Sequence, residues 1–389
     1  MRLTKRIVLF LNLSLLGFAC SEPEEEKVYF PLPQEDLEIV HSEVQSFMVD
    51  TVVTDLERPW GMEFLPDNRV LITERAGNLL IVEDGQVKEN PIQGNIPESL
   101  RHVELHPDYD ENGWIYLSYY IEPDPEGEDV GYTALMRGRL EGDRLVDDEF
   151  LFKAGPFDEE PRRLRVGHST GSRIAFDEEG YLYFAVGIRG GRMNAQDTSR
   201  YSGKTLRLND DGSIPSDNPF VDTEGALGEI FTYGQREHQG LIRHPETGEM
   251  WSVEHGQKGG DELNILRPGL NYGWPLASYS TEYSGEILTE DTLRAGMEPP
   301  IHHWTPSIAP SGLDVVLGDR YTGWTGDLFV GSLTQRMLNR SDLNDHRVVR
   351  DEKLLEGIGR VRNVKFAPDN YLYLITEDTG LMVRLIPVE

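Results

Sequence analysis

Charged and glycine residues gather in one stretch, Glu229–Pro275, which reads EIFTYGQREHQGLIRHPETGEMWSVEHGQKGGDELNILRPGLNYGWP. It contains an arginine after a Tyr-Gly turn, a His-Gly turn, an acidic pair and a Gly-Trp-Pro corner. The two strands expected in it, Ile230–Tyr233 and Met250–Val253, are rich in aromatic residues. Its charged residues therefore fall in turns, where folds built from strands carry binding and catalytic groups.

Other residues outside this stretch could also do chemistry. His168 lies between two glycines before another expected strand. An imidazole titrates near neutral pH, so this histidine could act as a general base, although a packed or surface histidine is the alternative. Arg360 and Arg362 are at strand spacing and face one side, where they could bind carboxylates. Trp304 could stack on a flat ligand or pack in the core.

The elements that must position these residues recur along the chain. A turn rich in Pro, Asp, Asn or Gly precedes a short alternating strand in six places: Leu65–Thr73, His106–Ser118, Asp177–Val186, His244–Val253, Gly323–Gly331 and Ala367–Thr376. A propeller blade supplies such a unit, and one blade cannot bury its faces alone. The sequence predicts an all-β fold, a six-bladed β-propeller, rather than a sandwich. Long inserts at Glu122–Arg165 and Ala277–Ile301 are expected to cover one face.

Composition limits the partners of the protein. The 389 residues carry 68 acidic and 37 basic side chains, which gives a formal net charge of −31. Nucleic acids and anionic membrane surfaces require a basic footprint, so we expect neither as a partner. Cys20 is the only cysteine in the sequence, which excludes an internal disulfide.

The first residues resemble a bacterial lipoprotein signal. Residues 1–20 have a positive start, an apolar run too short to span a bilayer, and a cleavage-like end before Cys20. We expect an exported protein, in the periplasm or attached to the outer membrane through a lipid on Cys20. Residues 21–43 would then form an acidic tether and 44–389 a single propeller domain. Ordinary secretion is the alternative.

The chain resembles the soluble PQQ-dependent aldose sugar dehydrogenases, the glucose/sorbosone dehydrogenase family. The resemblance rests on the repeats, on the run Arg207–Phe220 and on the corner Asn271–Pro275, which occur in the family's order. It implies oxidation of the anomeric hydroxyl of an aldose to a lactone, with hydride transfer to calcium-bound PQQ. An electron acceptor would then reoxidise the cofactor.

The resemblance also implies roles for individual residues. His168 would remove the hydroxyl proton, and Arg236 would stabilise negative charge on the quinone oxygen. Five residues would bind the cofactor: His255, Trp304, Ser307, Arg360 and Arg362. Four residues would hold calcium, two through backbone carbonyls beside the cofactor and two at a second, structural position: Gly256, Gln257, Glu262 and Tyr272.

Four positions depart from the family's pattern. Ile188 replaces the aspartate that orients the base, Glu237 an asparagine beside the cofactor, Gln257 a proline, and Thr334 a lysine. A second hypothesis therefore stays open, in which the propeller binds no cofactor, has lost redox activity and binds a glycan or a protein partner. A third, a calcium-dependent hydrolase, requires an acidic cluster that is not evident in the sequence.

Overall fold

The structure of the protein is a computed structural model. It describes residues 28–33, 37–121, 131–155, 170–188 and 191–388. His168 and the predicted signal segment with Cys20 lie outside these residues, so their roles stay predictions.

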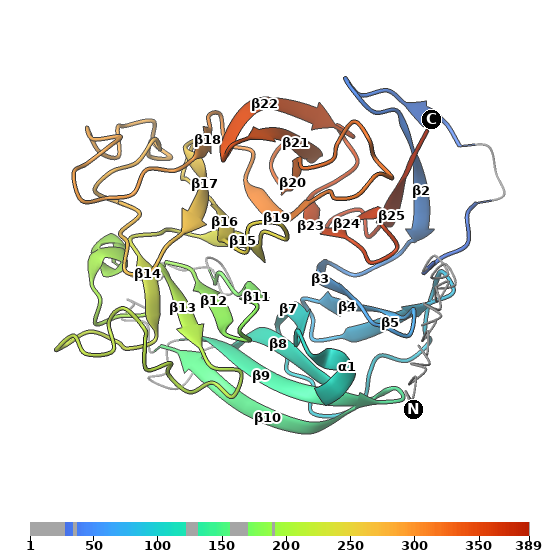
Figure 1. Cartoon of the computed structure of the whole chain (residues 1–389), viewed down its shortest axis with the longest axis horizontal. Coiled ribbons are helices and arrows are strands. Elements are labelled where there is room, and N and C mark those ends of the chain that lie inside the picture. Colours follow the sequence, from blue (N-terminus) through green and yellow to red (C-terminus); the bar gives the residue numbers. More distant parts are fainter. Residues whose placement is uncertain (1–27, 34–36, 122–130, 156–169, 189–190, 389) are drawn as a thin grey trace, which may run out of the picture.

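Six antiparallel sheets surround a central axis, as Figure 1 shows. Blades 1 to 3 consist, from the axis outward, of β3 (Pro59–Phe64), β4 (Val70–Glu74), β5 (Leu79–Glu83) and β6 (Gln86–Val87); of β7 (Leu100–Leu105), β8 (Trp114–Ile121), β9 (Tyr132–Glu141) and β10 (Arg144–Ala154); and of β11 (Ile174–Phe176), β12 (Leu182–Val186), β13 (Lys204–Leu208) and β14 (Ile230–Tyr233).

Blades 4 to 6 follow the same plan. They consist of β15 (His238–Arg243), β16 (Met250–Glu254), β17 (Asp261–Leu266) and β18 (His302–Trp304); of β19 (Pro310–Val315), β20 (Leu328–Ser332), β21 (Met337–Asn344) and β22 (Arg347–Leu354); and of β23 (Val361–Phe366), β24 (Leu372–Thr376), β25 (Met382–Pro387), β2 (Phe47–Val53) and β1 (Ile39–Val40). The first strand of each blade contacts the first strands of both neighbours, which closes the ring. The predicted six-bladed propeller is confirmed.

Each sequence repeat corresponds to the second strand of one blade and the turn before it. In blades 1, 3, 4, 5 and 6 this second strand is buried at every position. A neighbouring blade packs on each side of the sheet, so both faces of these strands are shielded and apolar residues are favoured throughout. The repeats were visible because this packing demands the same short apolar strand six times.

The described part of one predicted insert, residues 131–155, consists of strands and is not a face-covering loop. Within Glu122–Arg165, β9 and β10 are the two outer strands of blade 2, paired along most of their length. The second insert, Ala277–Ile301, does connect β17 to β18 without a long strand of its own.

The predicted tether boundary also needs correction. Tyr29 and Phe30 are 3% and 2% exposed and pack in the core between blades 1 and 6. The Tyr29 hydroxyl donates to the Leu65 carbonyl at 2.9 Å, and Arg384 donates to the Phe30 carbonyl at 2.8 Å. The segment around Tyr29 therefore belongs to the folded domain, because its aromatic rings pack against Phe64 of β3 and Tyr373 of β24.

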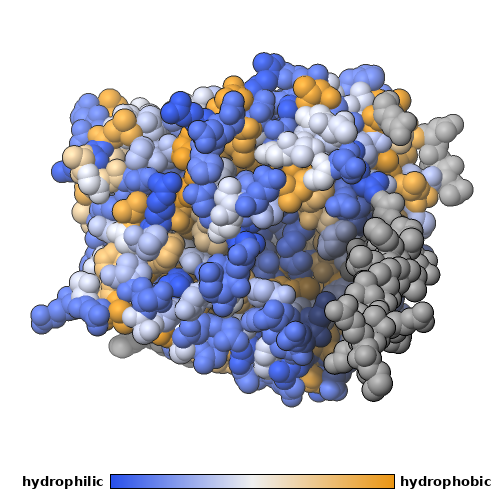
Figure 2. All heavy atoms as spheres, in the orientation of Figure 1, coloured by the Kyte–Doolittle hydropathy of each residue, from blue (hydrophilic) through white to orange (hydrophobic). Residues whose placement is uncertain are grey.

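Helix is scarce in the part of the chain that the structure describes. It is limited to α1 (Tyr109–Asn112) and the 3₁₀ helix η1 (Arg192–Gln196). Neither approaches the length and apolar character needed to cross a bilayer. Figure 2 shows a largely hydrophilic surface with scattered hydrophobic side chains, as the excess of acidic residues implies.

Candidate functional site

In four of the six blades, the second residue of the first strand lies at the same end of the axis. Trp60, Arg101, Gln239 and Arg362 each occupy this position in their strands, and all line one cavity of about 230 Å³. Loops between strands add further side chains to the same lining, which we call the arginine pocket: Arg75, Arg236, Glu237, His255, Tyr283 and Arg360. The pocket thus collects five arginines in a protein whose net charge is −31.

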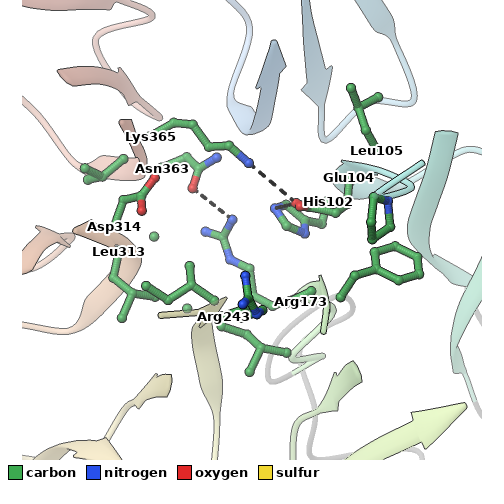
Figure 3. A pocket seen from close by; sticks show the side chains of 17 residues that line it. His102, Glu104, Leu105, Arg173, Arg243, Leu313, Asp314, Asn363 and Lys365 are labelled. Atoms are coloured by element: carbon green, nitrogen blue, oxygen red, sulfur yellow. Dashed lines mark hydrogen bonds and ion pairs between the residues drawn. The ribbon is translucent and has the colours of Figure 1, made fainter. Parts of the chain in front are cut away.

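A second cavity, of about 310 Å³, lies further along the same strands (Figure 3). Third and fifth residues of the first strands line it, among them Glu104, Asp314 and Lys365. Burial raises the pKa of Glu104 to about 8 and that of Asp314 to about 6. The Lys365 ammonium lies 3.7 Å from Glu104, so acidic and basic side chains lie next to each other in this cavity.

Arg173 separates the two cavities. It is 2% exposed, and its Nε donates to the Gln239 carbonyl at 2.6 Å while Nη2 donates to the Arg362 carbonyl at 2.8 Å. Its guanidinium also lies 4.0 Å from the ring centroid of Trp60. A polar side chain with several partners therefore fills the axis beneath the arginine pocket.

Glu377 holds several of the pocket's arginines in place. Its carboxylate contacts Arg362, Arg360 at 3.3 Å and Arg75 at 3.2 Å. Burial acts to raise the pKa of Glu377, but the nearby arginine charges outweigh it and lower the pKa to about 2. One carboxylate among these guanidinium groups shows that the pocket is suited to anionic groups.

Arg236 links the glycine-rich turn to the pocket. Its Nη1 donates to the carbonyls of His255 and Gly256, both at 2.9 Å, and its Nη2 donates to the Tyr283 hydroxyl at 3.3 Å. Burial lowers the pKa of His255 to about 3, so this imidazole is neutral, and its Nε2 lies 2.8 Å from the Pro310 carbonyl oxygen. The Gly256 carbonyl thus faces the positive charge of Arg236.

Two buried carboxyl groups lie side by side behind this turn. Glu254 and Glu262 are direct partners in the pairing of β16 with β17, and Asn264 donates to both, at 3.1 and 3.3 Å. Burial raises the pKa of Glu254 to about 7 and that of Glu262 well above its ordinary value. The Oδ1 atom of Asn264 is buried and has no hydrogen-bond partner among the residues described. Three oxygen-bearing side chains therefore meet where a hard cation would be stabilised.

The remaining predicted site residues lie outside the arginine pocket. Trp304 is 6% exposed, packs in the core of blades 4 and 5 and does not line this pocket, and its contact with a cofactor stays a prediction. The Ser307 hydroxyl donates to Asp261 at 2.7 Å and orders a turn instead of lining the cavity. Gln257 is buried, with its side chain directed at Trp274 and Glu282. The Tyr272 hydroxyl donates to the Ile265 carbonyl in the core.

No cluster of three or more His, Cys, Asp or Glu side chains that could hold a metal ion occurs within the described ranges. Backbone carbonyl and amide oxygens are also ligands of calcium, so they are the candidate ligands in this protein.

The sequence of this chain matches a known protein family. The model of the Glucose / Sorbosone dehydrogenase family matches residues 56–384. The chain belongs to the glucose/sorbosone dehydrogenase family. The match spans all six blades, so membership concerns the whole propeller.

Aldose sugar dehydrogenases from Escherichia coli and Streptomyces coelicolor are similar to this chain over most of their length. Aldose sugar dehydrogenase YliI of Escherichia coli (strain K12) is 37% identical over 353 residues, covering 87% of this chain and 92% of the relative. The crystal structure of the soluble aldose sugar dehydrogenase from Escherichia coli in the apo-form has a TM-score of 0.82 at 35% identity, covering 88% of this chain and 100% of that one. The PQQ-bound form of aldose sugar dehydrogenase from Streptomyces coelicolor has a TM-score of 0.68 at 26% identity, covering 88% and 98%. The family is one of oxidoreductases, and this chain is an enzyme of that class.

The departures from the pattern of the glucose/sorbosone dehydrogenase family have different placements. Glu237 lines the arginine pocket, where its Oε1 accepts from the Gly171 backbone at 3.2 Å and from the Gln239 amide. Ile188 donates its backbone N–H to the Arg236 carbonyl at 2.6 Å, so it supports Arg236 through the main chain. Thr334 is exposed, and Leu333 beside it lines the pocket.

Sequence reasoning missed several residues that this family member places in the pocket. Trp60, Arg101 and Gln239 come from first strands, whereas the repeats were recognised from second strands. A signal was present, because these residues and Arg362 each lie five positions before the turn that opens a repeat. Arg75, Tyr283 and Glu377 carry no such signal, since they lie in loops that only the closed ring brings together.

Proposed function

We propose that the protein is a PQQ-dependent aldose sugar dehydrogenase that oxidises the anomeric hydroxyl of an aldose to a lactone. The observation that carries the proposal is the convergence of five arginines from different parts of the chain, including blades 1, 2 and 6, on one axial pocket. Such a pocket suits a ligand with several carboxylates, because arginine binds carboxylates through charge-assisted hydrogen bonds. A related aldose sugar dehydrogenase is described in a PQQ-bound form.

The residues of this chain would divide the work by position. Arg360 and Arg362, together with Arg75, would bind carboxylates of the cofactor in place of part of their contact with Glu377. Bound PQQ would supply the acceptor for one hydride, which carries two electrons. Arg236 bonds to the exposed Tyr283, and its positive charge would stabilise negative charge that develops during the reaction. His168 stays the predicted base for the hydroxyl proton.

Calcium is part of the proposal at two places. The Gly256 carbonyl oxygen accepts a hydrogen bond from Arg236, and its second lone pair would bind Ca²⁺ beside the cofactor. The pair Glu254 and Glu262 with Asn264 provides side-chain oxygens for a structural cation, which would keep both buried carboxyl groups ionised. The first site would support the pocket wall and the second the fold.

Reconstitution tests the proposed function directly. Purified protein is loaded with PQQ and Ca²⁺ and desalted, and its quinone absorbance is followed on addition of glucose. Retained PQQ whose absorbance bleaches with the sugar supports the proposal. Loss of PQQ on desalting favours the alternative of a propeller that binds a glycan or protein without a cofactor.

Removing two arginines tests the assigned carboxylate contacts. The double variant Arg360→Ala, Arg362→Ala should weaken PQQ binding by about a hundredfold or more, since one hydrogen bond to a charged group contributes roughly 1.5–3 kcal/mol. Arg350→Ala is the matched control, because Arg350 is exposed on β22 and pairs with Glu43 away from the pocket. Unchanged PQQ affinity in the double variant would refute the assignment.

The cellular location is proposed from the first residues of the sequence. We expect an exported lipoprotein, with a lipid on Cys20 as its membrane attachment and an electron acceptor outside the cytoplasm. Labelling with a radioactive fatty acid should mark the wild type and not Cys20→Ala. A Cys20→Ala protein that is labelled equally would refute the anchor.

A further inference from the structure

An exposed aromatic side chain stands at the mouth of the arginine pocket. Tyr283 lines the pocket and is 70% exposed. The other aromatic ring in the lining, Trp60, is 3% exposed and is covered by the Arg173 guanidinium. Among the described lining residues, Tyr283 therefore presents the benzene ring that a ligand could contact.

The backbone beneath Tyr283 is well held, although its side chain is open. Thr281 pairs with Ile287, and the Glu282 N–H donates to the Glu286 carbonyl at 2.8 Å, which forms a hairpin with Tyr283 in its turn. Arg192 of η1 binds both carboxylate oxygens of Glu282, one of them at 2.8 Å. This hairpin holds the backbone of Tyr283 at the pocket without burying the ring, which favours binding because less of the chain must be ordered.

The glycine-rich turn explains how the hairpin comes so close. A Cβ atom on Gly256 would lie 2.4 Å from the Ser280 hydroxyl oxygen, and one on Gly260 would lie 2.5 Å from the Ser280 nitrogen. The Thr281 hydroxyl also donates to the Lys258 carbonyl at 3.2 Å. The glycines in this turn thus allow the chain before Tyr283 to pack directly beside Arg236.

The arrangement of charges leaves one place for a substrate. Arg360 and Arg362 lie with Glu377 on the side of the pocket assigned to the cofactor. Arg236 lies between the glycine-rich turn and Tyr283, and it donates to the Tyr283 hydroxyl at 3.3 Å. A sugar bound next to Arg236 would therefore lie close to Tyr283.

We propose that Tyr283 forms the aromatic wall of the substrate compartment and selects aldoses in the pyranose ring form. A pyranose has a face of C–H groups, which carry slight positive charge and match the negative face of an aromatic ring. The remaining lining is dominated by charged groups that cannot supply this contact. The inference rests on the proposed function and adds the residue that discriminates among its substrates.

Three variants test the proposal: Tyr283→Ala, Tyr283→Phe and the control Ile287→Ala. Ile287 is 63% exposed on the same hairpin and does not line the pocket. Each protein is loaded with PQQ and Ca²⁺, and its PQQ affinity is measured by absorbance. Steady-state turnover of glucose gives kcat and KM. Glucose binding is measured by calorimetry on protein that holds reduced PQQ, because no turnover occurs in that state. Thermal unfolding confirms that each variant is folded.

Loss of the ring should act on sugar binding alone. Tyr283→Ala should raise KM and the calorimetric Kd for glucose about tenfold, with kcat and PQQ affinity within about twofold of wild type. Tyr283→Phe and Ile287→Ala should bind glucose like the wild type. Unchanged glucose binding in Tyr283→Ala, or an equal loss in Ile287→Ala, would overturn the proposal.

The test also separates this inference from the proposed function. If the wild type retains PQQ but binds no glucose, the inference fails while the cofactor assignment stands. If the wild type retains no PQQ, the proposed function fails. Glucose binding is then compared between the cofactor-free wild type and cofactor-free Tyr283→Ala. Equal glucose binding by the two proteins, or no binding by either, overturns the role proposed for Tyr283.

Discussion

The Glu377 carboxylate lies among the arginines that we assign to the carboxylates of a ligand. Replacing Glu377 by Gln tests whether it stabilises these arginines while the ligand is absent. Glu377 is 6% exposed and contacts Arg362, Arg360 and Arg75. Burial opposes ionisation of this carboxyl group, yet the arginines lower its pKa from 4.5 to about 2. At about 1.4 kcal/mol per pKa unit, the folded protein favours the carboxylate by roughly 3 kcal/mol.

The sign of the pH dependence follows from the lowered pKa. The folded state binds this proton less readily than the unfolded state, so the contribution to the free energy of unfolding is complete above pH 4.5 and is lost as the pH falls toward 2. Glu377→Gln keeps the shape and removes the charge. At pH 7 its free energy of unfolding should be lower than that of the wild type by about 3 kcal/mol, and the difference should shrink below pH 4.5.

Denaturant unfolding with and without PQQ measures both consequences. PQQ should stabilise Glu377→Gln more than the wild type, because its carboxylates replace the missing negative charge. Glu352→Gln is the matched control, since Glu352 is 9% exposed and bonds Arg340 at 2.8 Å outside the pocket. Wild-type stability of Glu377→Gln at pH 7, or equal stabilisation of both variants by PQQ, would refute the reasoning.

Three further predictions concern the metal, the axis and the seam. In EDTA, the free energy of unfolding should fall as the pH rises from 5 to 8, because the buried Glu262 has a raised pKa and must give up its proton. At pH 8, Ca²⁺ should restore the stability of the wild type, measured by thermal unfolding, but not that of Glu262→Gln. Gly240→Ala should lower the free energy of unfolding by about 1–3 kcal/mol, since its Cβ would lie 2.4 Å from the Ser311 carbonyl oxygen. Gly228→Ala, with 3.5 Å to its nearest neighbour, should have little effect in the same urea titration. Phe30→Ala should cost about 3–5 kcal/mol and the exposed Val28→Ala almost nothing, whereas equal values would restore the picture of a loose tether.

The sequence alone determined the architecture and part of the pocket. Each repeat is local, because a turn and the strand after it are neighbours in the chain and must be apolar enough to lie between two blades. The resemblance to the family identified Arg236, His255, Arg360 and Arg362, all of which the structure brings to one pocket. For Arg360 and Arg362, strand spacing by itself also predicted side chains that face one side and could bind carboxylates.

Tertiary structure alone decided which other residues complete the site. Closing the ring places Trp60 and Arg101 beside Arg362, although they are separated by most of the chain, and it brings Arg75 against Glu377. It also packed Trp304 into the core of blades 4 and 5 and set Arg173 across the axis. The physical reason is that propeller blades bury both faces against one another, so the side on which a residue lies depends on the register of the closed ring and not on its neighbours in the chain.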